Sequence, residues 1–131
     1  MAERTFRLDK LVRDDIVLSH QDEGGSCVVR QLTPSEIRTA SDAKIDEEVA
    51  ELKADEDRGV GEYADVIEVL LHDAEIAGHT REEIFQAMND KTKEIGSFSM
   101  NTYIETVTVP EDSWLAEYYS SKPRFPEILG D

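Results

Sequence analysis

The stretch that decides the fold is residues 33–55, which reads TPSEIRTASDAKIDEEVAELKAD. It opens with a capping box, in which Thr33 can accept a hydrogen bond from the Glu36 amide while the Glu36 side chain reaches back to the Thr33 amide. Pro34 stands at the first helical position, where its missing N–H is tolerated. Three apolar residues then recur at helical spacing: Ile45, Val49 and Leu52. We therefore predict a helix from Thr33 to about Asp55.

A second helix is expected after a charged stretch with two glycines, residues 55–61, which should form a loop. This helix should span residues 62–77, because Gly78 stands where a left-handed glycine commonly ends a helix. One apolar face comprises Tyr63, Ile67, Leu70, Leu71 and Ala74. Two further apolar residues, Val69 and Ile76, fall on the opposite side, as in a central helix or one at a subunit interface. We therefore predict an antiparallel hairpin within a homodimer or higher homo-oligomer.

The remaining segments predict one more long helix and shorter flanks. A second capping box at residues 80–83 starts a helix that Gly96 should close at about Ile95. Residues 6–19 have the spacing of one short amphipathic helix. Two flanks are predicted to be non-helical: residues 27–30 suit a short strand or extended chain, and residues 97–109 alternate enough to be extended.

These elements predict an all-α, mainly helical protein with short extended flanking segments. At 131 residues the chain suits a single domain, residues 1–131. Its tail, residues 110–131, is expected to pack as a C-terminal arm. The tail is rich in aromatic side chains: Trp114, Tyr118, Tyr119 and Phe125.

The charge of the chain limits the partners it can have. Thirty acidic residues against 14 basic ones give a formal net charge of −16, which would repel nucleic acid polymers and anionic membrane surfaces. A nucleotide could approach only if cations mask this charge, and a divalent metal ion is the obvious candidate. Cys27 stands alone and no apolar leader opens the sequence, so we expect a cytoplasmic protein with no membrane partner.

Two acidic motifs fall on the predicted hairpin: Glu47-Glu48-x-x-Glu51 and Glu62-x-x-Asp65. Carboxylates three residues apart lie on the same face of a helix, so each pair can direct oxygens to one spot. On antiparallel helices the two pairs make a four-carboxylate cluster of the hard oxygen ligands that Mg²⁺ prefers. The alternative is a solvated face, because so acidic a chain produces such spacings by chance.

The two motifs resemble the signature of the all-α nucleoside triphosphate pyrophosphatases, the superfamily of MazG-type enzymes, dimeric dUTPases and phosphoribosyl-ATP pyrophosphohydrolases. In that superfamily E-E-x-x-E is followed after a variable gap by E-x-x-D. Residues 10–14, KLVRD, are similar to the opening of the phosphoribosyl-ATP pyrophosphohydrolase-like branch, and residues 64–70 to its central helix. The resemblance covers residues 10–98. It departs at Ile95-Gly96-Ser97-Phe98, where related sequences often have an arginine and two glycines before the phenylalanine.

The resemblance implies a role for each matching residue. The ligands of Mg²⁺, for which Mn²⁺ could substitute, would be Glu48, Glu51, Glu62 and Asp65. Glu47 would be an extra ligand or would orient the attacking water, which makes it the catalytic candidate. Phosphate contacts would come from Lys10, Arg13, Lys91 and Lys93. The implied reaction is cleavage of a nucleoside triphosphate, or a related phosphorylated nucleotide, to a monophosphate and pyrophosphate.

Several alternatives stay open at the level of sequence. Attack on the α-phosphorus is favoured over attack on the β-phosphorus, and no covalent nucleophile is expected. The nucleotide, the number of metal ions and the choice between dimer and tetramer are not determined. The rival function is a non-catalytic acidic interaction module or nucleic acid mimic, with its carboxylates facing solvent.

Overall fold

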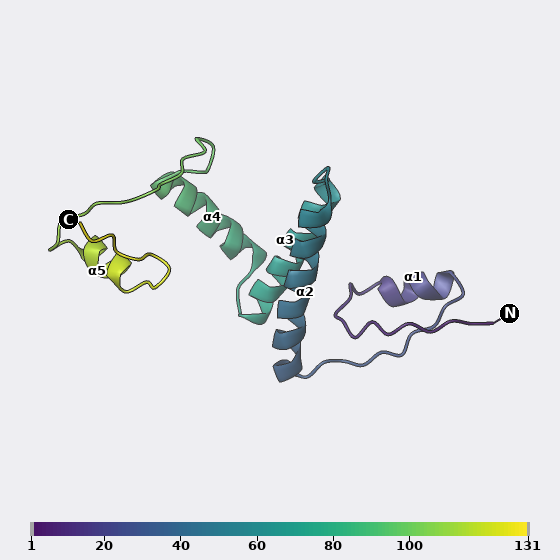
Figure 1. The fold of residues 1–131 in the computed structure, drawn as a ribbon. Coiled ribbons are helices and arrows are strands. Elements are labelled where there is room, and N and C mark those ends of the chain that lie inside the picture. Colours follow the sequence, from purple (N-terminus) through teal and green to yellow (C-terminus); the bar gives the residue numbers. More distant parts are fainter. Residues whose placement is uncertain (1, 131) are drawn as a thin grey trace. The chain divides into compact units, whose positions relative to one another are not determined.

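The regular structure of the protein is entirely helical in the part that the computed structural model describes, residues 2–130. Five helices follow one another there, with no β-strand among the described residues (Figure 1). The helices are α1 (Ile16–Asp22), α2 (Pro34–Ala54), α3 (Val60–Ile76), α4 (Arg81–Ile95) and α5 (Trp114–Ser120). The chain forms two compact units, Met1–Glu94 and Ile95–Asp131. The prediction of an all-α protein is confirmed.

Helix α2 begins and ends as its local sequence predicts. The Glu36 amide donates to Thr33 Oγ1 at 3.4 Å and the Thr33 amide donates to Glu36 Oε1 at 3.1 Å, so the capping box is formed in both directions. Arg30 adds an ion pair to Glu36 at 2.7 Å. At the other end Asp55 leaves the helix and accepts a 2.9 Å hydrogen bond from the Gly59 amide. This bond closes the short loop between α2 and α3.

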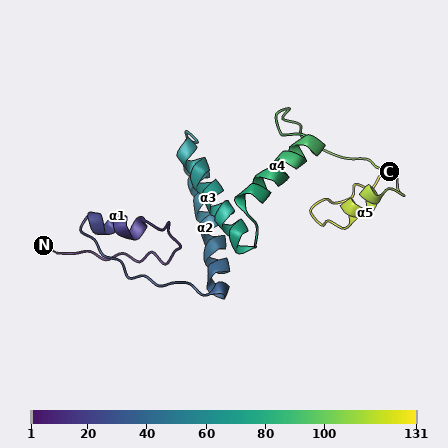
Figure 2. The ribbon, with the colours of Figure 1, turned by 180° about the vertical axis from the view of Figure 1, so that it is seen from behind.

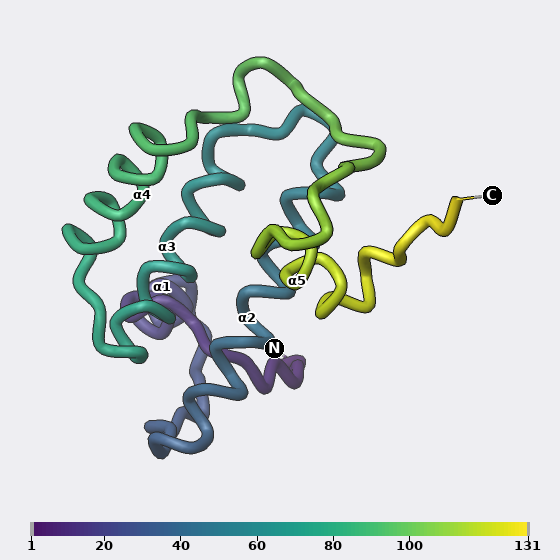
Figure 3. The backbone as a smooth tube through the Cα atoms, turned by 90° about the vertical axis from the view of Figure 1, so that its left-hand side faces the viewer, coloured from purple at the N-terminus to yellow at the C-terminus, as the bar shows by residue number. Residues whose placement is uncertain are grey.

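Helices α2 and α3 pack side by side as the predicted antiparallel hairpin. Figure 3 shows the chain running along α2, turning at the loop and returning along α3, and Figure 2 shows the same pair from behind. Helix α3 starts at Val60, two residues before the predicted start. Gly78, with φ +97°, ends it in the left-handed conformation that glycine adopts without steric strain. The hairpin is the frame that positions both acidic motifs.

The second capping box starts α4 as predicted. The Glu83 amide donates to Thr80 Oγ1 at 3.1 Å, and the Thr80 amide donates to Glu83 Oε1 at 3.3 Å. Arg81 in the first turn of α4 holds Glu68 of α3 with both carboxylate oxygens within 2.7 Å of Nη2. Gly96 follows the helix with φ +84°. Local sequence thus determines both ends of α4.

The helix predicted over residues 6–19 is wrong over residues 6–15. Helix α1 covers Ile16–Asp22 alone, and Asp9 has φ +47°, which an α-helix does not allow. The physical reason is tertiary: Lys10 and Arg13 reach carboxylates of α2 and α3 and form ion pairs there. The apolar spacing of this segment therefore reflects an irregular chain with two cationic contacts, which sequence periodicity cannot distinguish from a helix.

The two flanks expected to be extended are irregular. Residues 27–30 form no strand, which leaves the extended-chain alternative for them. In residues 97–109 the Asn101 amide donates to the Phe98 carbonyl at 3.0 Å, and Asn101 has φ +54°. The alternation of side chains there predicts an uninterrupted extended segment, but this turn interrupts it.

The C-terminal unit contains α5, a helix that the sequence analysis did not predict. Ser113 caps it by accepting a 3.2 Å hydrogen bond from the Leu115 amide. Its aromatic rings pack edge to face in a series, with centroid separations of 6.3, 5.1 and 5.7 Å for Trp114–Tyr118, Tyr118–Tyr119 and Tyr119–Phe125. The aromatic side chains of the arm therefore pack mainly against one another.

One copy of the chain buries little apolar surface. Leu71 is the one buried apolar side chain among residues 2–130, with an exposed fraction of 5%. Three residues of the apolar face predicted for α3 are almost half exposed, at 45% for Tyr63, 48% for Ile67 and 47% for Leu70. No helix in the described part of the chain is long and apolar enough to cross a membrane.

Candidate functional site

Four glutamates from the two acidic motifs gather where α2 and α3 approach their connecting loop. We call Glu47, Glu48, Glu51 and Glu62 the glutamate cluster. Three come from α2 and Glu62 comes from the first turn of α3. The negative charge of Glu48, with some desolvation and the charges of Glu47 and Glu62, raises the pKa of Glu51 above its ordinary value. The four carboxylates therefore lie close enough to repel one another.

Glu48 is the most buried member of the cluster, and carboxylates are rarely buried in proteins. Its exposed fraction is 7%, and its Oε2 atom is buried with no hydrogen-bond partner. Glu62 Oε2 is buried and unpartnered in the same way. Such oxygens are unfavourable unless a cation or donor satisfies them, and hard oxygen atoms are what Mg²⁺ binds. The carboxylate oxygens of Glu48 and Glu62 are therefore the kind of ligand that a divalent cation prefers.

Two lysines already contact the cluster. Lys10 Nζ donates to Glu47 Oε1 at 2.7 Å, and this hydrogen bond raises the pKa of Lys10 and lowers the pKa of Glu47. Lys44 lies 3.1 Å from Glu48 Oε1 and 3.6 Å from Glu47 Oε2. Lys10 is one of the predicted phosphate-binding residues, whereas Lys44 is not among the residues predicted from the sequence. The signal for Lys44 was its spacing, one turn before both glutamates on the same helix.

Asp65 is engaged separately from the glutamate cluster. Arg13 Nη2 donates to Asp65 Oδ1 at 2.8 Å, so the fourth predicted metal ligand is ion-paired in this structure. Lys10 and Arg13 thus bring the irregular N-terminal segment to both acidic motifs, one on each helix of the hairpin. Two of the four residues predicted to bind phosphate lie beside the predicted metal ligands.

The side chains are not arranged as a complete metal site. Among residues 2–130, no group of three or more His, Cys, Asp or Glu side chains is placed so that it could hold a metal ion. Lys10 and Lys44 contact both oxygens of Glu47, and Arg13 contacts Asp65. Glu51 makes no ion pair within the described chain and is exposed, so its side chain is able to turn.

No family model matches the chain. Comparisons with curated proteins and with solved structures found no match either. The case for a function therefore rests on the geometry of the glutamate cluster and on the motifs that it contains.

The other two predicted phosphate-binding residues, Lys91 and Lys93, lie on α4. Both are exposed, and neither makes an ion pair in the part of the chain that the structure describes. No contact joins them to the glutamate cluster among the ion pairs of these residues. Their role in binding phosphate stays a prediction, and their position in the second half of α4 equally suits the helix dipole.

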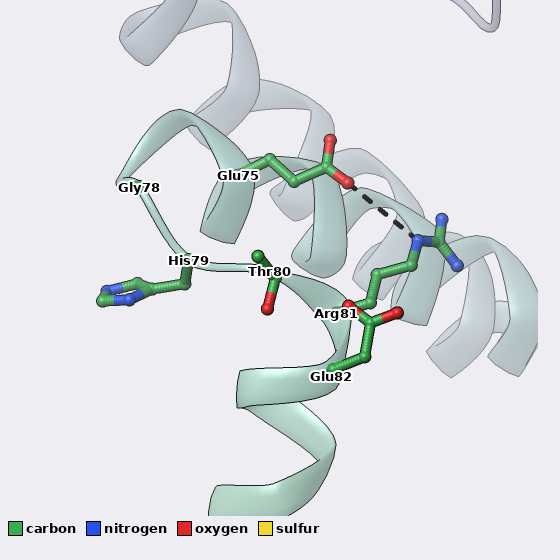
Figure 4. A pocket seen from close by; sticks show the side chains of 6 residues that line it. All are labelled: Glu75, Gly78, His79, Thr80, Arg81 and Glu82. Carbon is green, nitrogen blue, oxygen red and sulfur yellow. Dashed lines mark ion pairs between the residues drawn. The ribbon is translucent and has the colours of Figure 1, made fainter.

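A shallow pocket lies away from the glutamate cluster, at the junction of α3 and α4 (Figure 4). Its volume is about 490 Å³, and its lining residues are Glu75, Gly78, His79, Thr80, Arg81 and Glu82. Figure 4 shows His79 directed away from Arg81, which is turned toward Glu75 at 4.0 Å. Opposite charges in this pocket already face each other, and it contains none of the predicted site residues.

Proposed function

We propose that the protein is a Mg²⁺-dependent pyrophosphohydrolase that cleaves a nucleoside triphosphate, or a related phosphorylated nucleotide, to a monophosphate and pyrophosphate. The observation that carries the proposal is the buried carboxylate of Glu48, whose Oε2 atom lacks a partner, as does that of Glu62 on the facing helix. A chain with a net charge of −16 is expected to have many exposed carboxylates, but this composition does not explain why carboxylate oxygens should be buried.

The ligands we assign to the ion are Glu48, Glu51 and Glu62, with Asp65 joining them when Arg13 is released. When bound, Mg²⁺ supplies positive charge against the phosphate oxygens and makes attack by water easier. We assign the phosphate contacts to Lys10 and Arg13, which are ion-paired with Glu47 and Asp65 in this structure. When the nucleotide binds, Lys10 and Arg13 would leave Glu47 and Asp65 and pair with phosphate oxygens instead.

Glu47 is the residue we assign to the attacking water. Once Lys10 has moved to the phosphate chain, Glu47 Oε1 becomes free to accept a hydrogen bond from water and then its proton. Water attacks the α-phosphorus, a new phosphorus–oxygen bond forms, the bond to the bridging oxygen breaks, and pyrophosphate leaves. No covalent intermediate with the protein is needed.

The experiment that tests the proposal is a screen for pyrophosphate release with Mg²⁺. The panel should include canonical, deoxy and modified nucleotides and phosphoribosyl-ATP, and we expect pyrophosphate from at least one of them, with orthophosphate absent as the primary product. In ¹⁸O-water the label should enter the monophosphate if attack is on the α-phosphorus, and the pyrophosphate if it is on the β-phosphorus. A panel that gives no metal-dependent pyrophosphate contradicts the enzyme.

The second candidate is a non-catalytic acidic module that binds a basic partner or mimics nucleic acid. It is favoured by the net charge of −16 and by the lack, among the described residues, of a complete group of metal ligands. The response of the melting temperature to Mg²⁺ distinguishes the two candidate functions. An ion bound to the native state should raise the melting temperature at low millimolar Mg²⁺, whereas a solvated acidic face should respond equally to any salt of the same ionic strength.

A further inference from the structure

Lys44 is the least exposed cation that contacts the glutamate cluster. Its side chain is 13% exposed, against 38% for Lys10. It lies in the middle of α2, whereas Lys10 belongs to the irregular N-terminal segment. Lys10 can therefore leave the cluster when the segment moves, but Lys44 stays wherever α2 stays.

The contacts of Lys44 are not those of an ordinary surface pair on a helix. A glutamate that precedes a lysine by four residues stabilises a helix better than the reverse order, and here Lys44 precedes Glu48. The same Nζ atom lies 3.1 Å from Glu48 and 3.6 Å from Glu47, so one cation is shared by two carboxylates. It touches Glu48 Oε1 and leaves the buried Oε2 atom unpartnered.

The net charge of the glutamate cluster indicates how many divalent ions it can bind. Four ionised glutamates against Lys10 and Lys44 leave two negative charges, which one divalent ion neutralises. Asp65 and Arg13 form a neutral pair beside them. A second ion would have to approach Lys44, and repulsion between cations inside a partly buried site is stronger than in bulk water.

We propose that Lys44 is a positioning residue that shares Glu47 and Glu48 with the bound metal and limits the nucleotide-free protein to one divalent ion per chain. This inference rests on the proposed metal site and names its stoichiometry. Lys44 holds one oxygen of Glu48, leaves the other oxygen unpartnered, and keeps a positive charge among the carboxylates that a second ion would need.

The test is a titration of the nucleotide-free protein with Mn²⁺ at constant ionic strength, in which free Mn²⁺ is followed by electron paramagnetic resonance. Lys44→Gln removes the charge, Lys44→Arg keeps it, and Lys53→Gln is the matched control. Lys53 changes the net charge equally and lies on α2, but it is exposed and makes no ion pair among the described residues. Circular dichroism reports whether each variant is folded.

We expect one Mn²⁺ per chain in the unsubstituted protein. Lys44→Gln should bind the first ion at least about threefold more tightly, because a competing positive charge is gone, and should admit a second ion. Lys44→Arg should restore a single ion, and Lys53→Gln should change the affinity less than about twofold, because exposed charges are screened.

Each other result has a distinct meaning. Two ions of similar affinity in the unsubstituted protein, or an unchanged or weaker affinity in Lys44→Gln, would overturn the role of Lys44 and leave the metal site standing. An absence of Mn²⁺ binding in every form would overturn the proposed enzyme itself. If Lys44→Gln is unfolded by circular dichroism, Lys44→Met, which removes the charge but keeps an apolar side chain of similar length, takes its place and should likewise admit a second ion.

Discussion

Ser41 Oγ donates a 2.9 Å hydrogen bond to Asp73 Oδ1 across the hairpin, from a position where Ser41 is completely buried. The bond joins α2 to α3 and fixes how far one helix slides along the other. Ten residues separate Ser41 from Glu51 and eleven separate Asp73 from Glu62. At a rise of about 1.5 Å per residue, the two glutamates are carried to nearly the same level of the hairpin. A buried serine thus sets the register of the acidic motifs.

Ser41→Ala should lower the free energy of unfolding by about 1–2 kcal/mol, because Asp73 loses a buried donor but keeps Arg38 at 3.3 Å. Thr39→Ala is the control, since Thr39 is exposed on the same helix. Urea denaturation of both variants measures the difference. Equal stabilities would show that the hydrogen bond does not hold the register.

Glu51→Gln and Asp65→Asn should each reduce Mg²⁺-dependent activity by more than about 100-fold. Mutation of a residue that only hydrogen-bonds to a metal ligand typically reduces activity by about 10- to 100-fold, and loss of a charged ligand itself should reduce it more. The fold should persist, since both changes keep the side-chain volume and Glu51 is exposed. Glu56→Gln, in the loop after α2, is the control. Activity within about threefold of the original in both variants, a difference of roughly 0.6 kcal/mol, would contradict the assignment.

Glu48→Gln should lower the pKa of Glu51, because the charge of Glu48 is the largest cause of its rise. A carboxyl whose pKa is raised in the folded protein destabilises it as the pH rises through that pKa, since ionisation becomes harder there. The ordinary pKa of a glutamate is 4.5, and above this pH the substituted protein should therefore lose less stability to the ionisation of Glu51 than the original protein does. Carboxyl carbon resonances followed by NMR through the pH range report the pKa directly, and a pKa of Glu51 that does not move would show that the two carboxylates are not neighbours.

Whether a feature of this fold can be predicted from the sequence depends on how far apart along the chain the interacting residues are. The capping box of Thr33 and Glu36 involves four successive residues, and it forms as the sequence predicts. The helix predicted for residues 6–19 forms only from Ile16 onward, and in the part that is not helical Lys10 pairs with a residue 37 positions away. The burial of Ser41 is equally long-range, since serine is usually exposed and its partner is 32 positions away.

The same distinction applies to the site. Spacing on single helices was enough to single out Glu47, Glu48, Glu51 and Glu62 as candidates, and the structure brings these four together. Spacing could not show that Glu48 is buried while Glu51 is exposed, because burial depends on how α2 and α3 pack. Nor could it show that Arg13 holds Asp65. The identity of the acidic residues is local information, but their pairing is tertiary.

Glu36 should make the protein sensitive to strong acid. Its pKa is lowered to about 2, chiefly by the hydrogen bond from Arg30 and then by those from Thr33. A lowered pKa contributes stability that is present above the ordinary value of 4.5 and is lost as the pH falls through about 2. Glu36→Gln keeps the capping geometry but not the ionisation. Melting temperatures measured between these pH values should therefore fall less steeply for Glu36→Gln, and parallel curves would show that this contact contributes nothing.

The protein should be an oligomer at micromolar concentration. Tyr63, Ile67 and Leu70 share one face of α3 and are almost half exposed, and Leu71 is the one buried apolar side chain within residues 2–130. A chain that buries so little apolar surface alone gains stability by covering that face with a second copy. Light scattering measures the mass, and a value near 14.8 kDa would contradict the prediction.

Ile67→Glu should shift the mass toward that of the monomer, because a buried charge in an apolar interface is unfavourable. Glu75→Gln on the exposed end of the same helix should leave the mass unchanged, which separates loss of the interface from a general effect on α3.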